Sequence, residues 1–161
     1  MTQSQPSQPL PPLYRRLLVA TGSAAHSEVA LRRAGELALH FGATLHVVTV
    51  IPQGKSSLEN VAAAFAGGSA QDARTVQDER ARLEQYLRRA AQRLRDTGAE
   101  VQEHLVEALK PADAILAVAQ EVGADLIVLG RRHKTAWSAA LAGSVSDMVS
   151  HASAVDVLVV R

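Results

Sequence analysis

Short apolar runs alternate along the chain with longer stretches in which apolar residues recur every three or four positions. Residues 15–21 (RRLLVAT) and 43–51 (ATLHVVTVI) are short runs rich in branched residues, which is typical of buried strands. Between them, apolar residues at helical spacing are Ala30, Ala34, Leu37, Ala38 and Phe41. Gly42 follows, which suits a helix end because glycine tolerates a positive φ. This part of the chain predicts a strand, a helix and a second strand.

The second half of the chain continues this alternation. A long helix is indicated by the spacing of Val76, Leu83, Leu87, Ala90 and Leu94. Residues 99–106 (AEVQEHLV) alternate between apolar and polar, which predicts a half-exposed strand at a sheet edge. Pro111 suits the first turn of the next helix, whose inward residues are Ile115, Val118, Ala119 and Val122. Residues 124–130 (ADLIVLG) form an apolar run that predicts a central strand.

A last helix from Ser144 to about Ser153 and a last strand over 155–161 (VDVLVVR) complete the pattern. Strands that alternate with helices in this way favour an α/β fold with a parallel, doubly wound sheet and right-handed crossovers. Residues 52–69 break the pattern with Gly, Ser, Asn and Ala, and their SLENVAAAF stretch is compatible with a short helical piece. We expect an excursion from the domain there.

The composition fits one globular domain. The 161 residues are 47% hydrophobic but only 3% aromatic, so the core must be built from Val, Leu, Ile and Ala. Residues 1–13 are rich in Gln, Ser and Pro, and we expect a disordered tail ahead of a single domain over 14–161. Cysteine is absent and the start lacks the apolar stretch of a secretory signal, so the expected localisation is cytoplasmic.

Charge and spacing argue against several classes of protein. The 17 basic and 16 acidic residues nearly cancel, so we expect no nucleic-acid or membrane partner. No apolar run approaches the roughly 20 residues of a membrane-spanning helix. The six histidines lie scattered without a carboxylate at ligand spacing, and Ser144 and Ser146 form no nucleophile elbow. We therefore expect neither a protein-ligated metal nor a catalytic nucleophile.

Ligands of open α/β sheets bind beyond the carboxyl ends of the strands, where the strand order reverses. The most informative loop there is 130–144 (GRRHKTAWSAALAGS), in which Gly130 lets the backbone approach a ligand closely. Gly143 and Ser144 open a helix, whose N-terminus favours anions. Cationic side chains in the loop are Arg131, Arg132 and Lys134. A turn glycine and a capping serine explain the same residues without a ligand, so both interpretations stay open on these features alone.

The spacing within this loop matches a known motif. Gly130, two residues, His133, nine residues, Gly143 and Ser144 form the pattern G-x2-H-x9-G-S. From Tyr14 to Arg161 the chain resembles the universal stress protein family, whose nucleotide-binding members carry G-x2-G-x9-G-[ST] after the fourth strand. The stretches that carry the resemblance outside the loop are LLVATGSAAHSEVAL, PADAILAVAQEVGADLIVLG and GSVSDMVSHASAVDVLVV.

The resemblance implies both a fold and a ligand. The implied fold is Rossmann-like, of the adenine nucleotide alpha hydrolase-like type, with an open five-stranded parallel sheet of order 3-2-1-4-5 and helices on both faces. The implied ligand is ATP or a related adenine nucleotide with magnesium, bound as a stress-response signal by a protein that is not an enzyme. The implied nucleotide-binding residues are Thr21, Gly22, Val47, Gly130, Arg131, His133, Gly143, Ser144, Val145 and Ser146. Among them, Val47 is implied to contact the adenine through its backbone.

Two positions depart from the family pattern. Gly22 stands where the family has an aspartate at the end of the first strand, which removes a carboxylate from the ribose and phosphate side. His133 stands where binders often have glycine, and its imidazole either blocks close backbone approach or donates a hydrogen bond to a phosphate. We expect weaker and less magnesium-dependent binding than in members that keep the aspartate.

A second class of function stays open. The chain is then a non-nucleotide member of the family that acts as a dimeric protein–protein interaction module. The last strand contributes an apolar segment, residues 155–160, at the edge of the implied sheet, and uncovered edges of this kind pair readily with another chain. We expect a homodimer through this strand, unless Asp156 and Arg161 protect the edge well enough to leave a monomer.

Overall fold

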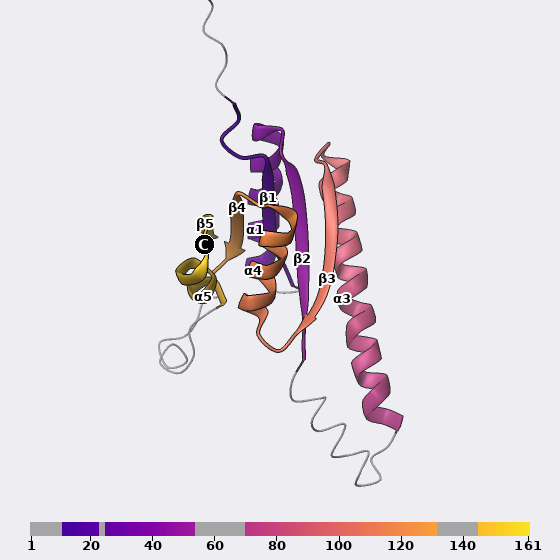
Figure 1. The fold of residues 1–161 in the computed structure, drawn as a ribbon. Coiled ribbons are helices and arrows are strands. Elements are labelled where there is room, and N and C mark those ends of the chain that lie inside the picture. The colour runs from indigo at the N-terminus through magenta and orange to yellow at the C-terminus, as the bar shows by residue number, and fades with distance from the viewer. Residues whose placement is uncertain (1–10, 23–24, 54–69, 132–144) are drawn as a thin grey trace, which may run out of the picture.

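The computed structural model of the chain describes residues 11–22, 25–53, 70–131 and 145–161. Five strands form one parallel sheet in the order β3-β2-β1-β4-β5 (Figure 1). The strands are β1 (Arg16–Ala20), β2 (Thr44–Pro52), β3 (Val101–Ala108), β4 (Leu126–Gly130) and β5 (Asp156–Val160). The helices of the described residues are α1 (Ala25–Phe41), α3 (Ala70–Asp96), α4 (Pro111–Val122) and α5 (Val145–Ala152). The predicted fold class and strand order are confirmed.

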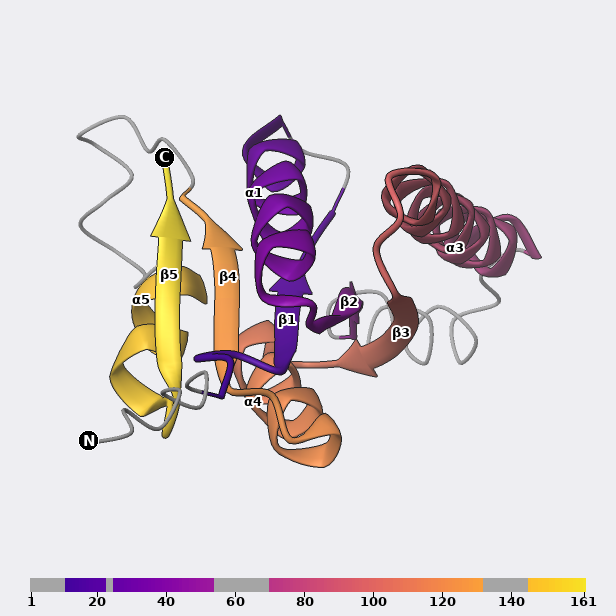
Figure 2. The ribbon, with the colours of Figure 1, turned by 90° about the horizontal axis from the view of Figure 1, so that it is seen from above.

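The helices cover both faces of the sheet. Figure 2 shows α1 and α3 on one face and α4 and α5 on the other. Successive side chains of a strand point to opposite faces, so Leu17 and Val19 pack beneath α1 and α3, whereas Leu18 packs beneath α4 and α5. All three side chains are completely buried. A strand covered on both faces has no polar alternation, which explains the continuous apolar run of β1.

Two helices end at glycines in the left-handed backbone region. Gly42 follows α1 with a φ of 62°, as the sequence predicts, and Gly123 follows α4 with a φ of 63°. A side chain with a Cβ is strained in this conformation, so glycine is the residue that lets the chain turn directly into the next strand. Pro111 occupies the first turn of α4, as predicted.

Some sequence predictions concern residues that the structure does not describe. They include residues 1–10 of the predicted tail and residues 54–69 of the predicted excursion over 52–69. The division into a disordered tail over 1–13 and a domain over 14–161 therefore stays a prediction. Both edge positions are confirmed, because β3 and β5 lie at the two ends of the sheet.

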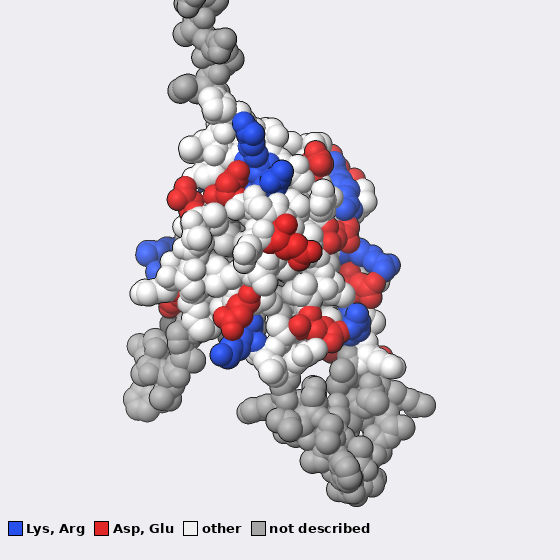
Figure 3. Space-filling view, in the orientation of Figure 1, with Lys and Arg blue, Asp and Glu red and all other residues white. Residues whose placement is uncertain are grey.

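The described surface carries charges of both signs. On the face shown in Figure 3, Lys and Arg side chains are interspersed with Asp and Glu side chains. Within the described residues, no helix combines the length and the apolar character that crossing a membrane requires. Exposed charges are also paired along helices, as between Glu84 and Arg88 on α3.

Two histidines on neighbouring strands form a pair beneath α4. Nδ1 of His46 on β2 lies 3.0 Å from Nε2 of His104 on β3. Burial lowers the pKa of His46, and the nearby charges of His104 and Arg16 lower it further, against the opposing effect of Glu100. Burial also lowers the pKa of His104, although Glu121 on α4 acts in the opposite direction. The pair is therefore held in its neutral form.

Acidification should destabilise the folded protein through this pair. The folded pKa of both histidines lies below the value of about 6.5 expected in the unfolded chain. The unfolded chain therefore binds more protons in this range, so the stabilisation is complete above about pH 6.5 and is lost as the pH falls through the folded pKa values. Melting temperatures between about pH 8 and pH 5 test this. In a His46→Gln, His104→Gln double variant the acid-induced decrease should be smaller, and an equal decrease would contradict the prediction.

Candidate functional site

The carboxyl ends of β1 and β4 lie side by side at the point where the strand order reverses. The two strands are paired, and their other neighbours in the sheet, β2 and β5, lie on opposite sides of this pair. After β1 the chain continues into α1 on one face of the sheet, whereas after β4 it reaches α5 on the other face. In doubly wound sheets, ligands usually bind beyond the carboxyl ends of the strands at such a reversal of the strand order.

Six of the predicted site residues lie at this edge of the sheet. Thr21 and Gly22 directly follow β1, and Gly130 is the last residue of β4. Arg131 comes next, with an exposed side chain and a backbone N–H that donates to the carbonyl of Val160, 2.8 Å away. The other two, in the first turn of α5, are Val145 and the buried Ser146.

Three predicted site residues lie outside the described residues, namely His133, Gly143 and Ser144. The two ends of the loop that contains them are described, because Gly130 closes β4 and Val145 opens α5. The N-terminus of α5 therefore lies at one end of this loop, and the helix dipole favours negative charge at that end.

Val47 lies deeper in the sheet than the other predicted residues. It pairs with Val19 of β1 and Glu103 of β3, and its side chain is completely buried. Leu45 donates its backbone N–H to Glu100 on the β3 side, and alternate residues of a strand point their backbone groups the same way. The backbone groups of Val47 therefore face β3. The carboxyl end of β2 lies farther along the strand, at Pro52.

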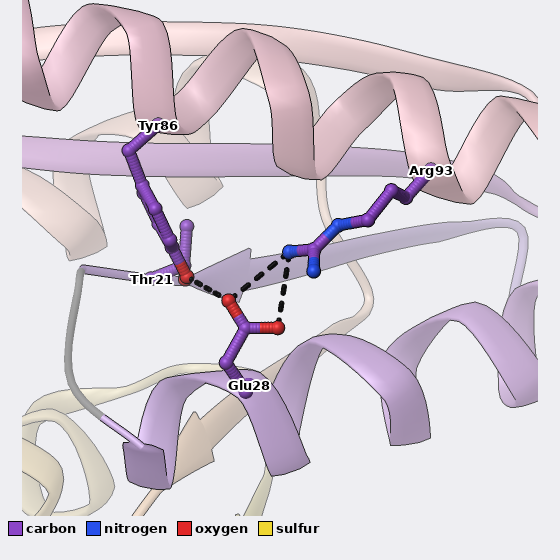
Figure 4. Close-up of polar contacts among 4 residues, drawn as sticks. All are labelled: Thr21, Glu28, Tyr86 and Arg93. Carbon is purple, nitrogen blue, oxygen red and sulfur yellow. Dashed lines mark hydrogen bonds and ion pairs between the residues drawn. The ribbon is translucent and has the colours of Figure 1, made fainter.

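A polar network that the sequence did not reveal surrounds Thr21. Figure 4 shows Tyr86 and Arg93 extending from α3 towards Glu28 on α1. The Tyr86 hydroxyl lies 3.1 Å from Oγ1 of Thr21 and donates to Glu28 over 2.7 Å. Nη2 of Arg93 donates to both oxygens of the same carboxylate, at 3.1 and 3.0 Å. The network ties α3 to the end of β1 and to the start of α1.

The protonation states in this network follow from its contacts. Burial raises the pKa of Glu28, but the hydrogen bonds from Tyr86 and Arg93 and the charge of Arg93 together hold it below its ordinary value. Burial and the contact with Glu28 raise the pKa of Tyr86 to about 12, although its contact with Thr21 acts in the opposite direction. At neutral pH Glu28 is therefore an ionised acceptor and Tyr86 keeps its proton.

Thr49 adds an unpaired hydroxyl to the same region. Its side chain is 1% exposed, and among the described residues Oγ1 of Thr49 is the buried side-chain polar atom without a hydrogen-bond partner. Leaving such a group unpaired costs about 1–3 kcal/mol, whereas valine has the same shape and no such cost. Thr49 lies one residue beyond Val48, which is opposite the last residue of β1.

The sheet and its helices form a Rossmann-like α/β fold in which the strand order reverses between β1 and β4. The chain belongs to the universal stress protein family, because the model of that family matches residues 13–161. A search of curated protein sequences returns no significant match.

Solved structures of the family share the fold. The universal stress protein UspA from Lactobacillus plantarum is 22% identical, with a TM-score of 0.72 over 92% of this chain and 98% of its own. A universal stress protein in complex with cAMP is 28% identical, with a TM-score of 0.66 over 92% and 97% of the two chains. One from Archaeoglobus fulgidus in complex with dAMP is 27% identical, with a TM-score of 0.61 over 92% and 99%. Some relatives thus bind adenine nucleotides.

Proposed function

We propose that the protein binds ATP or a related adenine nucleotide at the carboxyl ends of β1 and β4, where the strand order reverses. The observation that carries the proposal is the match between the motif and the fold. Gly130 ends β4 and Val145 begins a helix, so the G-x2-H-x9-G-S spacing spans the loop between a strand end and a helix N-terminus. Relatives in complex with cAMP and dAMP support the same ligand class.

In this proposal the phosphates lie between the loop after β4 and the first turn of α5. Backbone N–H groups at a helix N-terminus suit this role because they carry partial positive charge. The proposed phosphate-side residues are Gly130, Arg131, His133, Gly143, Ser144, Val145 and Ser146. Thr21 and Gly22 lie beneath the ribose, and Val47 belongs to the strand beneath the adenine. Magnesium accompanies the nucleotide through its phosphates.

We further propose that nucleotide occupancy, and not turnover, is the output of the protein in a cytoplasmic stress response. Phosphoryl transfer needs a base or a water-orienting group beside the phosphates. Gly22 offers no such group where the family has an aspartate, and the Glu28 carboxylate is already engaged by Tyr86 and Arg93. This arrangement supports a binding protein that is not an efficient ATPase.

Calorimetric titration with ATP, with and without magnesium, tests the proposal. We expect saturable heat of binding, a raised melting temperature and, in denatured fresh protein, a carried-over nucleotide detectable by mass spectrometry. Because Gly22 provides no carboxylate, magnesium should change the affinity only slightly. Neither heat nor a thermal shift at a nucleotide concentration of about 1 mM would remove the nucleotide proposal.

The edge strand β5 favours a second candidate function, a dimeric interaction module with a vestigial pocket. Leu158 on this strand is 37% exposed although it is paired with the completely buried Val128. An apolar edge strand of this kind suits pairing with a second copy of the chain. This function becomes the leading one if the ATP titration gives no binding.

A further inference from the structure

Thr21 and Thr49 lie next to each other on one face of the sheet. The register pairs Ala20 with Val48, and the backbone N–H of Thr21 donates to the Val48 carbonyl over 2.9 Å, so Thr21 stands opposite Thr49. Both share the side-chain direction of Val47, which packs beneath α1 and α3. The two hydroxyls therefore point to the same face at the carboxyl edge of β1 and β2.

The neighbours of Thr21 determine whether its hydroxyl donates or accepts a hydrogen bond. Tyr86 has one hydroxyl proton and donates it to the ionised Glu28. In its 3.1 Å contact with Tyr86, Thr21 must therefore be the donor. A ligand at this edge then meets Thr21 as a hydrogen-bond acceptor. Thr49, which has no partner, can still accept a hydrogen bond.

We propose that Thr21 and Thr49 form the base-selecting end of the nucleotide site, where the exocyclic amino group of adenine donates one N–H to each hydroxyl. This inference rests on the proposed function. Neighbouring strands lie about 4.8 Å apart. An amino group that makes two hydrogen bonds of about 2.9 Å at an angle of about 120° spans about 5 Å between its acceptors. The general spacing of paired strands is thus close to the distance that one amino group can bridge.

The same arrangement disfavours guanine. Guanine has a carbonyl oxygen where adenine has the amino group, and that oxygen is only an acceptor. The guanine oxygen would face the acceptor oxygen of Thr21, and two acceptors form no hydrogen bond. The network through Tyr86 and Glu28 therefore favours a base that presents a hydrogen-bond donor. Because Thr49 is only 1% exposed, neighbouring side chains must part for the base to reach it. The competing explanation is that a buried water satisfies Thr49, in which case its hydroxyl plays no part in binding.

The test compares ATP, GTP and purine riboside triphosphate, which lacks the amino group, by calorimetry. The wild-type protein should prefer ATP to both. Thr49→Val should weaken ATP binding about fivefold to tenfold, and weaken the analogue without the amino group hardly at all. Tyr86→Phe leaves the Thr21 proton free to donate to a carbonyl, so it should strengthen GTP binding and narrow the preference for ATP.

Controls separate this inference from a structural role and from the proposed function. Thr44→Val, at the opposite end of β2, should leave all three affinities unchanged, and Thr49→Ser should retain the preference for ATP. The melting temperature of Thr49→Val without nucleotide should not fall, because the variant removes an unpaired buried hydroxyl. The inference is overturned if Thr49→Val binds ATP as tightly as the wild-type protein, or if the substitution weakens the binding of ATP and of the analogue equally. Either outcome would leave the proposed function standing. No ATP binding to the wild-type protein would overturn both.

Discussion

Gly22→Asp should raise the affinity for ATP about 10- to 100-fold when magnesium is present, which corresponds to a hydrogen bond or bridge to a charged group of about 1.5–3 kcal/mol. The substitution restores the carboxylate that the family carries at the end of the first strand. The structure has room for it, because a Cβ added at Gly22 meets no atom within 4 Å and the residue does not have a positive φ. The new side chain therefore costs little in folding.

The gain should depend on magnesium. Without the cation, a carboxylate beside the phosphates repels them, so the variant should then bind ATP no better than the wild-type protein. Gly22→Asn is the matched control, because it has the same shape without the charge and should show little magnesium dependence. Calorimetric titrations of the wild-type protein and of the two variants with ATP, with and without magnesium, measure these affinities. Equal gains for Asp and Asn, or a gain that persists without magnesium, would contradict the proposed position of Gly22 beneath the ribose and within reach of a magnesium ion on the phosphates.

The fold was predictable because its elements have local sequence signals. The buried strands β1 and β4 read as apolar runs, and α1 shows helical spacing that ends at Gly42, whose φ is 62°. The strand order could not be predicted from these local signals, because periodicity does not indicate which strands are neighbours in the sheet. It came from the resemblance of the loop after β4 and its flanking segments to a known family, and the observed sheet confirms it.

The candidate site was predictable only where a motif marks it. Gly130 and the start of α5 follow from motif spacing, and the structure describes both. Tyr86 and Glu28 are 58 positions apart, and no local pattern indicates that a tyrosine on a long, charged helix reaches the end of β1. Such contacts arise from packing between α3 and the sheet, so they become visible only in three dimensions.

The relative positions of Thr49 and Val47 at the site also could not be predicted from the sequence alone. In the sequence both belong to one apolar strand, and the family resemblance pointed to Val47 as the residue at the adenine. The register distinguishes their positions, because β1 ends opposite Val48 and leaves Thr49 as the first residue of β2 beyond it. A shift of one or two residues along a strand changes both depth and face, and sequence patterns do not fix that register.

Leu158→Lys should convert the protein from a dimer into a monomer. The prediction places the dimer interface on β5, whose edge is apolar and half-exposed along Val157, Leu158, Val159 and Val160. The opposite edge strand, β3, is less suited to pairing because it carries Glu103 and Glu107, which form ion pairs with Arg95 and Arg80 of α3. A lysine in the middle of β5 would place a charge in the interface, which is how natural edge strands avoid pairing.

Light scattering over a wide range of protein concentrations measures this change directly, and Leu109→Lys is a matched control. Leu109 is 72% exposed and directly follows β3, so its replacement alters the opposite edge of the sheet and should leave the dimer intact. A wild-type protein that is monomeric at every concentration would remove the dimer and with it the interaction-module function. A dimer that persists in Leu158→Lys would instead place the interface away from β5. Because β5 lies beside β4, whose end Gly130 belongs to the proposed phosphate side, loss of the dimer should also be checked for its effect on ATP affinity.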